Sequence, residues 1–158
     1  MSTGLTESDF RLTCENGFGD GWNGYAHSMA WFEGRLYVGT TRGSIASLRL
    51  NHPPPDWKPW PVDCPDDLYD VDRRTQIWQF TPETGVWKKV FQAPWIKSRK
   101  GRDVPRYIGL RGMTVYQGKG DTKPCLYVST WAPLLAPEPS DILRSEDGES
   151  FTHVPPPD

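Results

Sequence analysis

Hydrophobic and polar residues alternate with a period of two in two stretches of the chain that resemble each other closely. The first stretch runs from Met29 to Thr41, and the second runs from Met113 to Thr130 with a polar insertion at residues 117–124. Such alternation on both sides of a short turn predicts a β-hairpin. Each stretch therefore predicts two antiparallel strands, and the insertion falls at a hairpin tip, where extra residues are tolerated.

A second hairpin is predicted downstream of each stretch. Residues 75–80 and 86–91 flank the turn Thr-Pro-Glu-Thr-Gly, and residues 141–144 and 150–154 flank the turn Ser-Glu-Asp-Gly-Glu. Pro or Asp early in a turn and Gly near its end are typical, because Pro presets φ and Gly tolerates positive φ. The chain therefore predicts two consecutive four-stranded antiparallel meanders.

Self-similar units of four short strands are the sequence signature of a β-propeller, in which each unit forms one blade. The predicted fold class is all-β, with two four-stranded antiparallel meanders as the β-propeller blades of an incomplete ring. The expected organisation is an N-terminal tail with a possible ring-closing strand (1–23), blade 1 (24–92) with a long loop between its second and third strands (41–74), an inter-blade loop (93–112) and blade 2 (113–158).

Two short sequences resemble the blades of known propellers. Leu-Tyr-Val-Gly-Thr at 36–40, and Ile-Trp-Gln-Phe followed by Gly-Val-Trp at 77–87, are similar to kelch-type or sialidase-like repeats. The resemblance covers roughly residues 24–155. It implies a propeller fold and little about function.

The turn from Ser145 to Phe151 resembles the Asp-box turn of sialidase-like propellers, although it is one residue shorter and has Phe151 where Trp is usual. In that family the aspartate has a structural role. The resemblance therefore implies that Asp147 caps its own turn by accepting backbone N–H bonds, with Ser145 and Gly148 as the other residues of the structural turn.

Two blades cannot close a ring, and exposed strand edges and apolar blade faces invite association. The expected partner is a further copy of this chain, which would complete the propeller as a homo-oligomer, or another protein subunit. A chain that is the front part of a longer protein fits equally well. Residues Phe10–Thr13 are expected either to add a ring-closing strand to a neighbouring blade or to remain a loose tail.

The strand order places the two long loops, 41–74 and 92–112, on one face of the predicted scaffold, where binding residues usually lie. The first loop is rich in Asp and the second in Lys and Arg. Opposite charge on neighbouring loops predicts either mutual docking through solvated ion pairs or a recognition surface for a protein segment or a glycan. The candidate ligand- or partner-binding residues on this face and at the channel mouth are Tyr25, His27, Trp57, Trp60, Trp95, Arg106, Tyr107, Arg111 and Trp131.

Catalysis and metal binding are not expected. The acidic run Asp66–Asp72 lacks the alternating spacing, the Gly and the terminal Glu of an EF-hand loop, so no metal site and no other cofactor is predicted. The residue sets of sialidases and of kelch-type copper oxidases cannot be assembled from two blades. The sequence also contains no Gly-x-Ser-x-Gly, His-Glu-x-x-His or Walker motif, and no catalytic residue is assigned.

The favoured function is a non-catalytic β-propeller module that completes a larger ring or docks as a structural subunit in a multiprotein complex. The alternative is a carbohydrate-binding or carbohydrate-processing propeller fragment, because the loop tryptophans offer aromatic faces on which sugar rings can stack.

Composition sets further limits. A hydrophobic content of 36% and a net charge of −2 are typical of soluble globular proteins and argue against a nucleic-acid binder. A membrane-spanning helix needs a run of about 18 apolar residues, and no run in this sequence comes near that length. The N-terminus also lacks a signal-peptide pattern, so a cytoplasmic location is expected. The cysteines Cys14, Cys64 and Cys125 lie far apart and predict neither a disulfide framework nor a zinc site.

Overall fold

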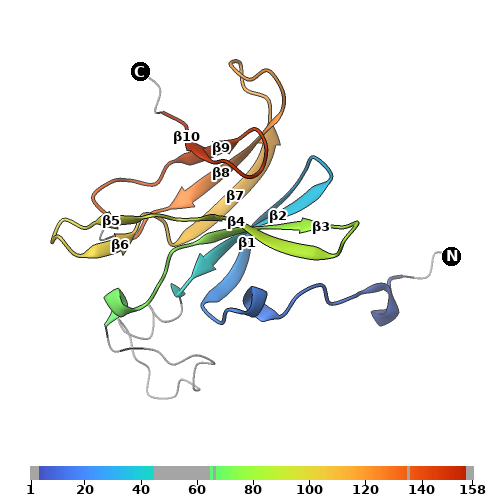
Figure 1. Cartoon of the computed structure of the whole chain (residues 1–158), viewed down its shortest axis with the longest axis horizontal. Coiled ribbons are helices and arrows are strands. Elements are labelled where there is room, and N and C mark those ends of the chain that lie inside the picture. The colour runs from blue at the N-terminus through green and yellow to red at the C-terminus, as the bar shows by residue number, and fades with distance from the viewer. Residues whose placement is uncertain (1–3, 45–64, 66, 135, 156–158) are drawn as a thin grey trace.

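The computed structural model describes residues 4–44, 65, 67–134 and 136–155, and strands dominate this part of the chain (Figure 1). None of the helices among these residues has the length and hydrophobicity needed to cross a membrane. The strands are β1 (Asn23–Phe32), β2 (Arg35–Arg42), β3 (Gln76–Thr81), β4 (Val86–Gln92), β5 (Trp95–Lys97), β6 (Asp103–Pro105), β7 (Gly109–Tyr116), β8 (Cys125–Trp131), β9 (Ile142–Ser145) and β10 (Thr152–His153), and the 3-10 helices are η1 (Glu7–Asp9), η2 (Asn16–Gly19) and η3 (Leu68–Asp70).

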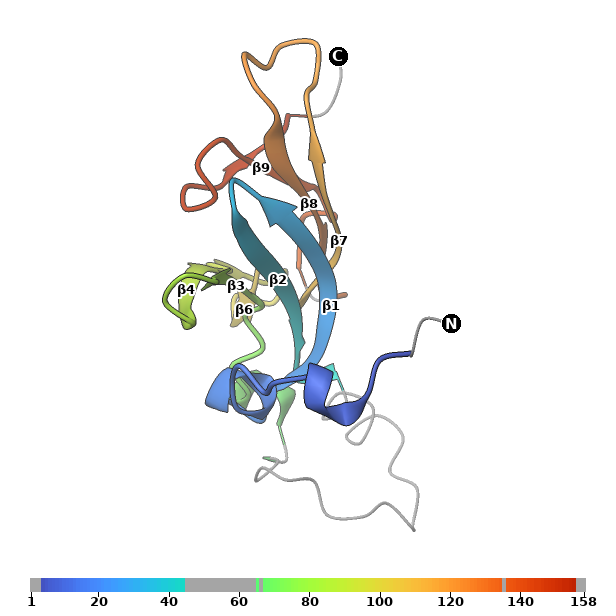
Figure 2. The ribbon, with the colours of Figure 1, turned by 90° about the vertical axis from the view of Figure 1, so that its right-hand side faces the viewer.

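The predicted all-β class and its two antiparallel meanders are confirmed. Strands β1 to β4 pair in chain order to form the first meander, and β7 to β10 pair in chain order to form the second. One residue pair between β2 and β7, Thr41 opposite Gly109, joins the two meanders. The result is a single antiparallel sheet that is strongly curled (Figure 2).

Strands β1 and β7 both begin earlier than the alternation predicts, at Asn23 and Gly109. Each has an irregularity near its start, between Ala26 and Ser28 in β1 and between Leu110 and Gly112 in β7. Such a β-bulge inserts an extra residue and shifts the side-chain alternation, so a period-two pattern does not extend across it. This is why the first part of each strand escaped the sequence prediction.

Two other expectations need correction. The predicted inter-blade loop 93–112 contains the hairpin β5–β6, whose three-residue strands are too short to show an alternation. The last strand is shorter than the predicted 150–154, since β10 spans only Thr152–His153. For Phe10–Thr13, where the sequence left a strand and a loose tail open, the structure has no strand. The N-terminal segment therefore does not lengthen a sheet in this structure.

The hydrophobic core lies between the two meanders. Residues directly opposite each other on antiparallel strands project from the same face of a sheet, so the register assigns each core residue to one face of its meander. The core residues are at most 4% exposed: Phe32, Tyr37 and Ile77 from the first meander, Leu110, Leu126, Val128 and Leu143 from the second, and Ala93 and Tyr107 from the segment between them.

The β9–β10 turn fits closely against the first meander. Gly148 has a φ of +74°, and a Cβ atom at this position would overlap the phenol group of Tyr37. Tyr37 is fully buried, and its hydroxyl accepts a hydrogen bond from Gln79 Nε2 at 2.7 Å. The neighbouring ion pair between Lys88 and Glu149, at 3.0 Å, is about half exposed and adds little. Close packing at Gly148 therefore fixes how the two meanders meet.

Candidate functional site

The face of the first meander that points away from the second is largely apolar, and we call it the aromatic flank. Alternation places its side chains opposite to those of the core face, and the cross-strand register arranges them in two rows. The rows are Met29, Val38, Trp78 and Lys89, and Trp31, Leu36, Phe80 and Trp87, so Lys89 is the one charged residue among them.

The part of the aromatic flank that lies on β1 is open to solvent. Met29 and Trp31 lie two residues apart on β1 and are 58% and 59% exposed. Exposed apolar side chains that stand singly on a surface need no explanation, whereas a contiguous patch marks an interaction site. Met29 and Trp31 are the β1 members of the two rows and lie opposite Val38 and Leu36, so they form part of such a patch.

The outer edge of the aromatic flank, formed by Trp78 on β3 and Trp87 on β4, is covered by the chain's own N-terminal segment. The Phe18 ring stacks on Trp78 with centroids 4.8 Å apart and an interplanar angle of 9°, and it also contacts Trp87 at 4.9 Å. Phe18 has a φ of 59°, a conformation that costs of order 1 kcal/mol in a non-glycine residue. This cost is offset by burying the ring against two indoles.

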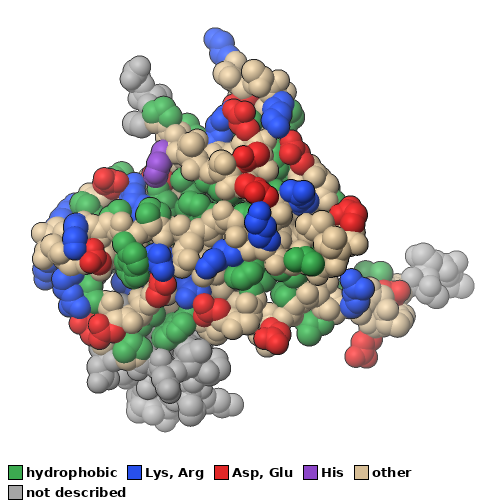
Figure 3. Space-filling view, viewed as in Figure 1, with side chains coloured by type: hydrophobic (Ala, Val, Ile, Leu, Met, Phe, Trp, Pro, Cys, Tyr) green, Lys and Arg blue, Asp and Glu red, His purple; other side chains and the backbone are tan. Residues whose placement is uncertain are grey.

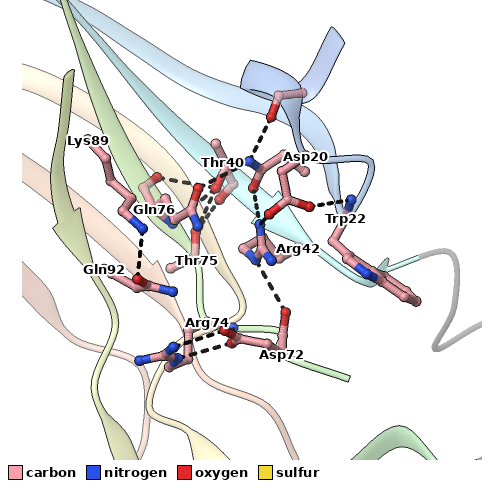
Figure 4. Close-up of polar contacts among 12 residues, drawn as sticks. Asp20, Trp22, Thr40, Arg42, Asp72, Arg74, Thr75, Gln76, Lys89 and Gln92 are labelled. Atoms are coloured by element: carbon pink, nitrogen blue, oxygen red, sulfur yellow. Dashed lines mark hydrogen bonds and ion pairs between the residues drawn. The ribbon is translucent and has the colours of Figure 1, made fainter. Parts of the chain in front are cut away.

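A network of hydrogen bonds fixes this segment to the first meander (Figure 4). The Arg42 guanidinium, only 3% exposed at the residue level, binds Asp20 Oδ2 at 2.7 Å and Asn23 Oδ1 at 3.0 Å. The Asn23 amide donates to Gly17 O at 2.9 Å and to Gln76 Oε1 at 3.1 Å. The stretch that carries Phe18 is thus tied to β1, β2 and β3.

A second surface lies where the two meanders join. His27 Nδ1 is 2.6 Å from Thr41 Oγ1, and Thr41 faces Gly109 across the bridge between β2 and β7. A Cβ atom on Gly109 would come within 2.7 Å of Thr41 Oγ1 and 3.0 Å of the Trp131 ring. The Arg111 guanidinium lies 4.0 Å from the centre of that ring. Four of these residues thus form one chain of contacts from His27 to Trp131, and Arg111 extends it.

Four of the sequence-predicted binding residues belong to this junction. His27, Arg111 and Trp131 are members of the contact chain, and Tyr25 is 50% exposed with its ring centroid 6.1 Å from that of His27. A cation stacked on an indole is worth about 0.5–1 kcal/mol at an exposed site. The arrangement can bind a polar group, but Arg111 already occupies one face of the Trp131 ring.

Arg106 and Tyr107 are placed differently, in the buried segment between β6 and β7, where they contact the β8–β9 loop and β10. Arg106 is 6% exposed and pairs with Asp141 and Glu138 at 3.0 Å. Tyr107 is fully buried and donates to Asp141 Oδ2 at 2.8 Å, and His153 Nδ1 lies 2.9 Å from the same oxygen. Neither Arg106 nor Tyr107 therefore offers a free side chain to a partner.

The protonation of this cluster follows from its contacts. Burial and the hydrogen bond to Asp141 raise the pKa of Tyr107 above its ordinary value, so the phenol stays a donor. Burial alone would raise the pKa of Asp141, but hydrogen bonds from Tyr107 and His153 outweigh it and lower that pKa. In the described part of the chain, no hydroxyl or thiol hydrogen-bonds to His153 Nε2 as a nucleophile would, so the geometry gives a structural network.

The long loops contact each other through opposite charges. Arg102 on the second loop pairs with Asp67 on the first at 3.0 Å, and its guanidinium lies 3.4 Å from the centre of the Tyr69 ring. Basic side chains gather over the β5–β6 hairpin (Figure 3). Trp95 on β5 is 42% exposed with Arg74 at 4.8 Å from its ring centre.

Part of the acidic loop lies outside the description. Trp57 and Trp60 are not among the described residues, and neither is Asp66. The residues that are described contain no group of three or more His, Cys, Asp or Glu side chains arranged to hold a metal ion.

The β9–β10 turn is closed by its own side chains. Asp147 Oδ1 accepts the backbone N–H groups of Glu149 at 2.8 Å and Ser150 at 2.7 Å, and the Gly148 N–H donates to Ser145 Oγ at 2.8 Å. The two backbone bonds lower the pKa of Asp147, because they stabilise its charged form. Asp147 therefore caps this turn, and the role of Ser145 and Gly148 is structural.

Sequence reasoning missed Phe18 and a carboxylate at the β7–β8 tip. Asp121 Oδ2 accepts from the Tyr127 hydroxyl at 2.6 Å and the Gly118 N–H at 2.7 Å, and Oδ1 accepts from Arg144 Nε at 2.7 Å. These bonds, led by that from Tyr127, lower the pKa of Asp121 to about 2. The signal in the sequence was an Asp inside a Gly-rich tip.

Comparison with known proteins adds no relative: no family model matches the chain, and no curated protein or solved structure is significantly similar to it.

Proposed function

We propose that this chain is a non-catalytic assembly module made of two β-propeller blades, and that its aromatic flank binds another β-meander. The observation that carries the proposal is that two apolar side chains, Met29 and Trp31, are exposed to solvent on a largely apolar sheet face. Burying apolar surface is worth roughly 25 cal/mol per Å², so an exposed patch of this kind favours association.

The internal repeat supports a β-meander as the partner. In the second meander the residue equivalent to Leu36 of the flank is Leu126, which is fully buried against the first meander, whereas Leu36 is partly exposed. Val38 and its equivalent Val128 are both buried. The same type of face is therefore covered by a meander within this chain. The flank has the same pattern of residues, but in the described part of the chain no meander covers it, and only the N-terminal segment packs on its outer edge.

The composition of the flank also favours an interface. Where the second meander has Val115, Leu143 and Phe151, the flank has tryptophans, at positions 31, 78 and 87. Tryptophan is enriched among the residues that dominate binding energy at interfaces, because its large surface loses little conformational entropy.

The glycan alternative receives no support from Trp95 and Trp131, two described tryptophans outside the flank. One face of the Trp131 ring is taken by Arg111, and Arg74 lies over the Trp95 ring. Catalysis is not favoured either, since the Asp141–His153 pair serves Tyr107 and Arg106 in a structural cluster.

The proposal is tested with anilinonaphthalene sulfonate fluorescence and native mass measured side by side. We expect the wild-type chain either to bind the dye or to self-associate, and the double variant Met29→Glu/Trp31→Glu to do neither. Leu134→Glu, at a fully exposed apolar side chain in the β8–β9 loop and on neither sheet face, serves as the matched control and keeps the wild-type behaviour. A wild-type monomer that binds no dye, and behaves as the double variant does, would show the proposal to be wrong.

A further inference from the structure

The second meander also has a face that points away from the core, and we call it the tyrosine face. Tyr116 and Ile142 on this face are 61% and 46% exposed. The ring of Tyr116 meets that of Tyr127 edge-on with centroids 6.1 Å apart. The face consists of Thr114, Tyr116, Tyr127, Ser129, Ile142 and Arg144.

The tyrosine face is the repeat equivalent of the core face of the first meander. Tyr127 corresponds to Tyr37, because each lies in the middle of the second strand within the shared Leu-Tyr-Val sequence. Ile142 corresponds to Ile77 at the start of the third strand. The register agrees, since Ile77 lies opposite Gly39 and Ile142 lies opposite Ser129, two residues beyond each tyrosine.

The aromatic pairs repeat in the same way. Phe32 and Tyr37 on the core face have ring centroids 6.0 Å apart at 58°, and Tyr116 and Tyr127 on the tyrosine face have centroids 6.1 Å apart at 63°. The pair on the core face is buried against the second meander, whereas Tyr116 is exposed. The tyrosine face thus has the shape of a face that packs against a meander.

We propose that the tyrosine face of one copy of this chain packs on the aromatic flank of a second copy, repeating the contact between the two meanders within each chain. This inference rests on the proposed function and names its partner. Each free face is the equivalent of one half of an interface that the chain already forms. The contact is heterologous, with a different surface on each side, and such contacts give rings when the rotation closes.

The N-terminal segment fits this arrangement. Within the chain, Phe91 of the first meander contacts Phe151 of the second, with ring centroids 5.4 Å apart. Trp87 is the repeat equivalent of Phe151, and its aromatic neighbour from outside the meander is Phe18 at 4.9 Å. When a second copy docks on the flank through its tyrosine face, its residue equivalent to Phe91 is Pro155, which has no aromatic ring. Phe18 therefore supplies the outer aromatic ring that a second copy lacks.

The polar groups of the tyrosine face do not oppose docking. Arg144 pairs with Asp121 at 2.6 Å and with Glu146 at 2.6 Å, and the Tyr127 hydroxyl donates to Asp121. Burying a charge is costly when it lacks a partner, and these charges are already paired. Tyrosine is also common at interfaces, because it combines a large apolar ring with a hydroxyl that keeps its hydrogen bond.

The test is a complementation experiment by sedimentation velocity. Trp31→Glu breaks the flank and leaves the tyrosine face, while Ile142→Glu does the reverse; Leu134→Glu is the control. We expect wild type and control to self-associate, and each interface variant to do so at least about tenfold more weakly. An equimolar mixture of the two interface variants should form a one-to-one dimer and nothing larger, because only one intact interface remains between them.

The outcomes separate this inference from the proposed function. Wild-type protein that associates while the mixture stays monomeric overturns the head-to-tail contact. Wild-type protein that stays monomeric up to millimolar concentration, yet binds dye at the flank, overturns self-association and leaves a different β-meander as the partner. Far-UV circular dichroism confirms folding, and Trp31→Gln with Ile142→Thr replaces any variant that does not fold.

Discussion

The two meanders share one sequence pattern but place it in different surroundings. Val38 and Val128 are buried in both meanders, but Leu126 of the second is fully buried, while the equivalent Leu36 of the first is partly exposed beside Trp31 and Met29. A repeat therefore fixes which residues face one way, but the neighbour determines whether that face is covered. The difference locates the place where a neighbour is missing.

The strongest test of this comparison removes the same side chain from both meanders. Leu126→Ala should lower the free energy of unfolding by about 2–5 kcal/mol, because it leaves a cavity in the core. Leu36→Ala should cost no more than about 1 kcal/mol, since solvent and neighbours fill the space on the flank. Urea denaturation at a protein concentration where the chain is monomeric measures both values. Equal losses would mean that the flank is buried as the core face is.

The turns that close the two meanders give the next largest contrast. Gly148 and Gly85 both have positive φ, +74° and +68°, but a Cβ on Gly148 would overlap Tyr37 while a Cβ on Gly85 would meet nothing within 4 Å. Gly85→Ala should therefore cost about 1 kcal/mol for its conformation alone. Gly148→Ala should cost more than about 2 kcal/mol, because it also displaces Tyr37 from Gln79.

Thermal unfolding of the two alanine variants measures this difference. Gly85→Ala is the matched control, since it has the same backbone strain without the steric overlap. Similar melting temperatures for the two variants would contradict the close fit between the β9–β10 turn and the first meander.

A smaller effect is expected where the N-terminal segment covers the flank. Phe18→Ala should destabilise the chain by about 1–2 kcal/mol, because the ring is partly buried on Trp78 and Trp87. Tryptophan fluorescence should shift to the red as the two indoles become wetter. Phe10→Ala, at a ring that is 68% exposed, should change neither quantity measurably. An unshifted spectrum for Phe18→Ala would argue that the segment is detached in solution.

The strands were predictable from sequence because alternation of hydrophobic residues is a local property. Leu36 and Leu126 occupy the same place in the repeated pattern, so no local signal tells that Leu126 is fully buried and Leu36 is not. Phe18 was missed because it lies between two glycines in a stretch with no periodicity. The bulges in β1 and β7 and the burial of Tyr107 depend on contacts between distant segments. Such contacts leave no trace in a single sequence.

The smallest effect we expect depends on pH and compares the hydrogen bonds of the two equivalent tyrosines. Tyr37 is bound by the neutral Gln79, whereas Tyr127 is bound by Asp121, whose pKa is lowered from 3.8 to about 2. A carboxyl with a lowered pKa in the folded state stabilises the fold fully above its unfolded pKa, and this stabilisation is lost as the pH falls through about 2.

The difference in melting temperature between wild type and Asp121→Asn should therefore be constant from neutral pH to about pH 4 and should shrink as the pH approaches 2. Gln79→Ala provides the comparison, because no titrating carboxylate holds Tyr37 and its effect should not change over this range. If the effect of Asp121→Asn is also independent of pH, the charge on Asp121 does not hold Tyr127 and Arg144. The tyrosine face would then be held by packing and uncharged hydrogen bonds, as is the core face of the first meander, where the neutral Gln79 binds Tyr37.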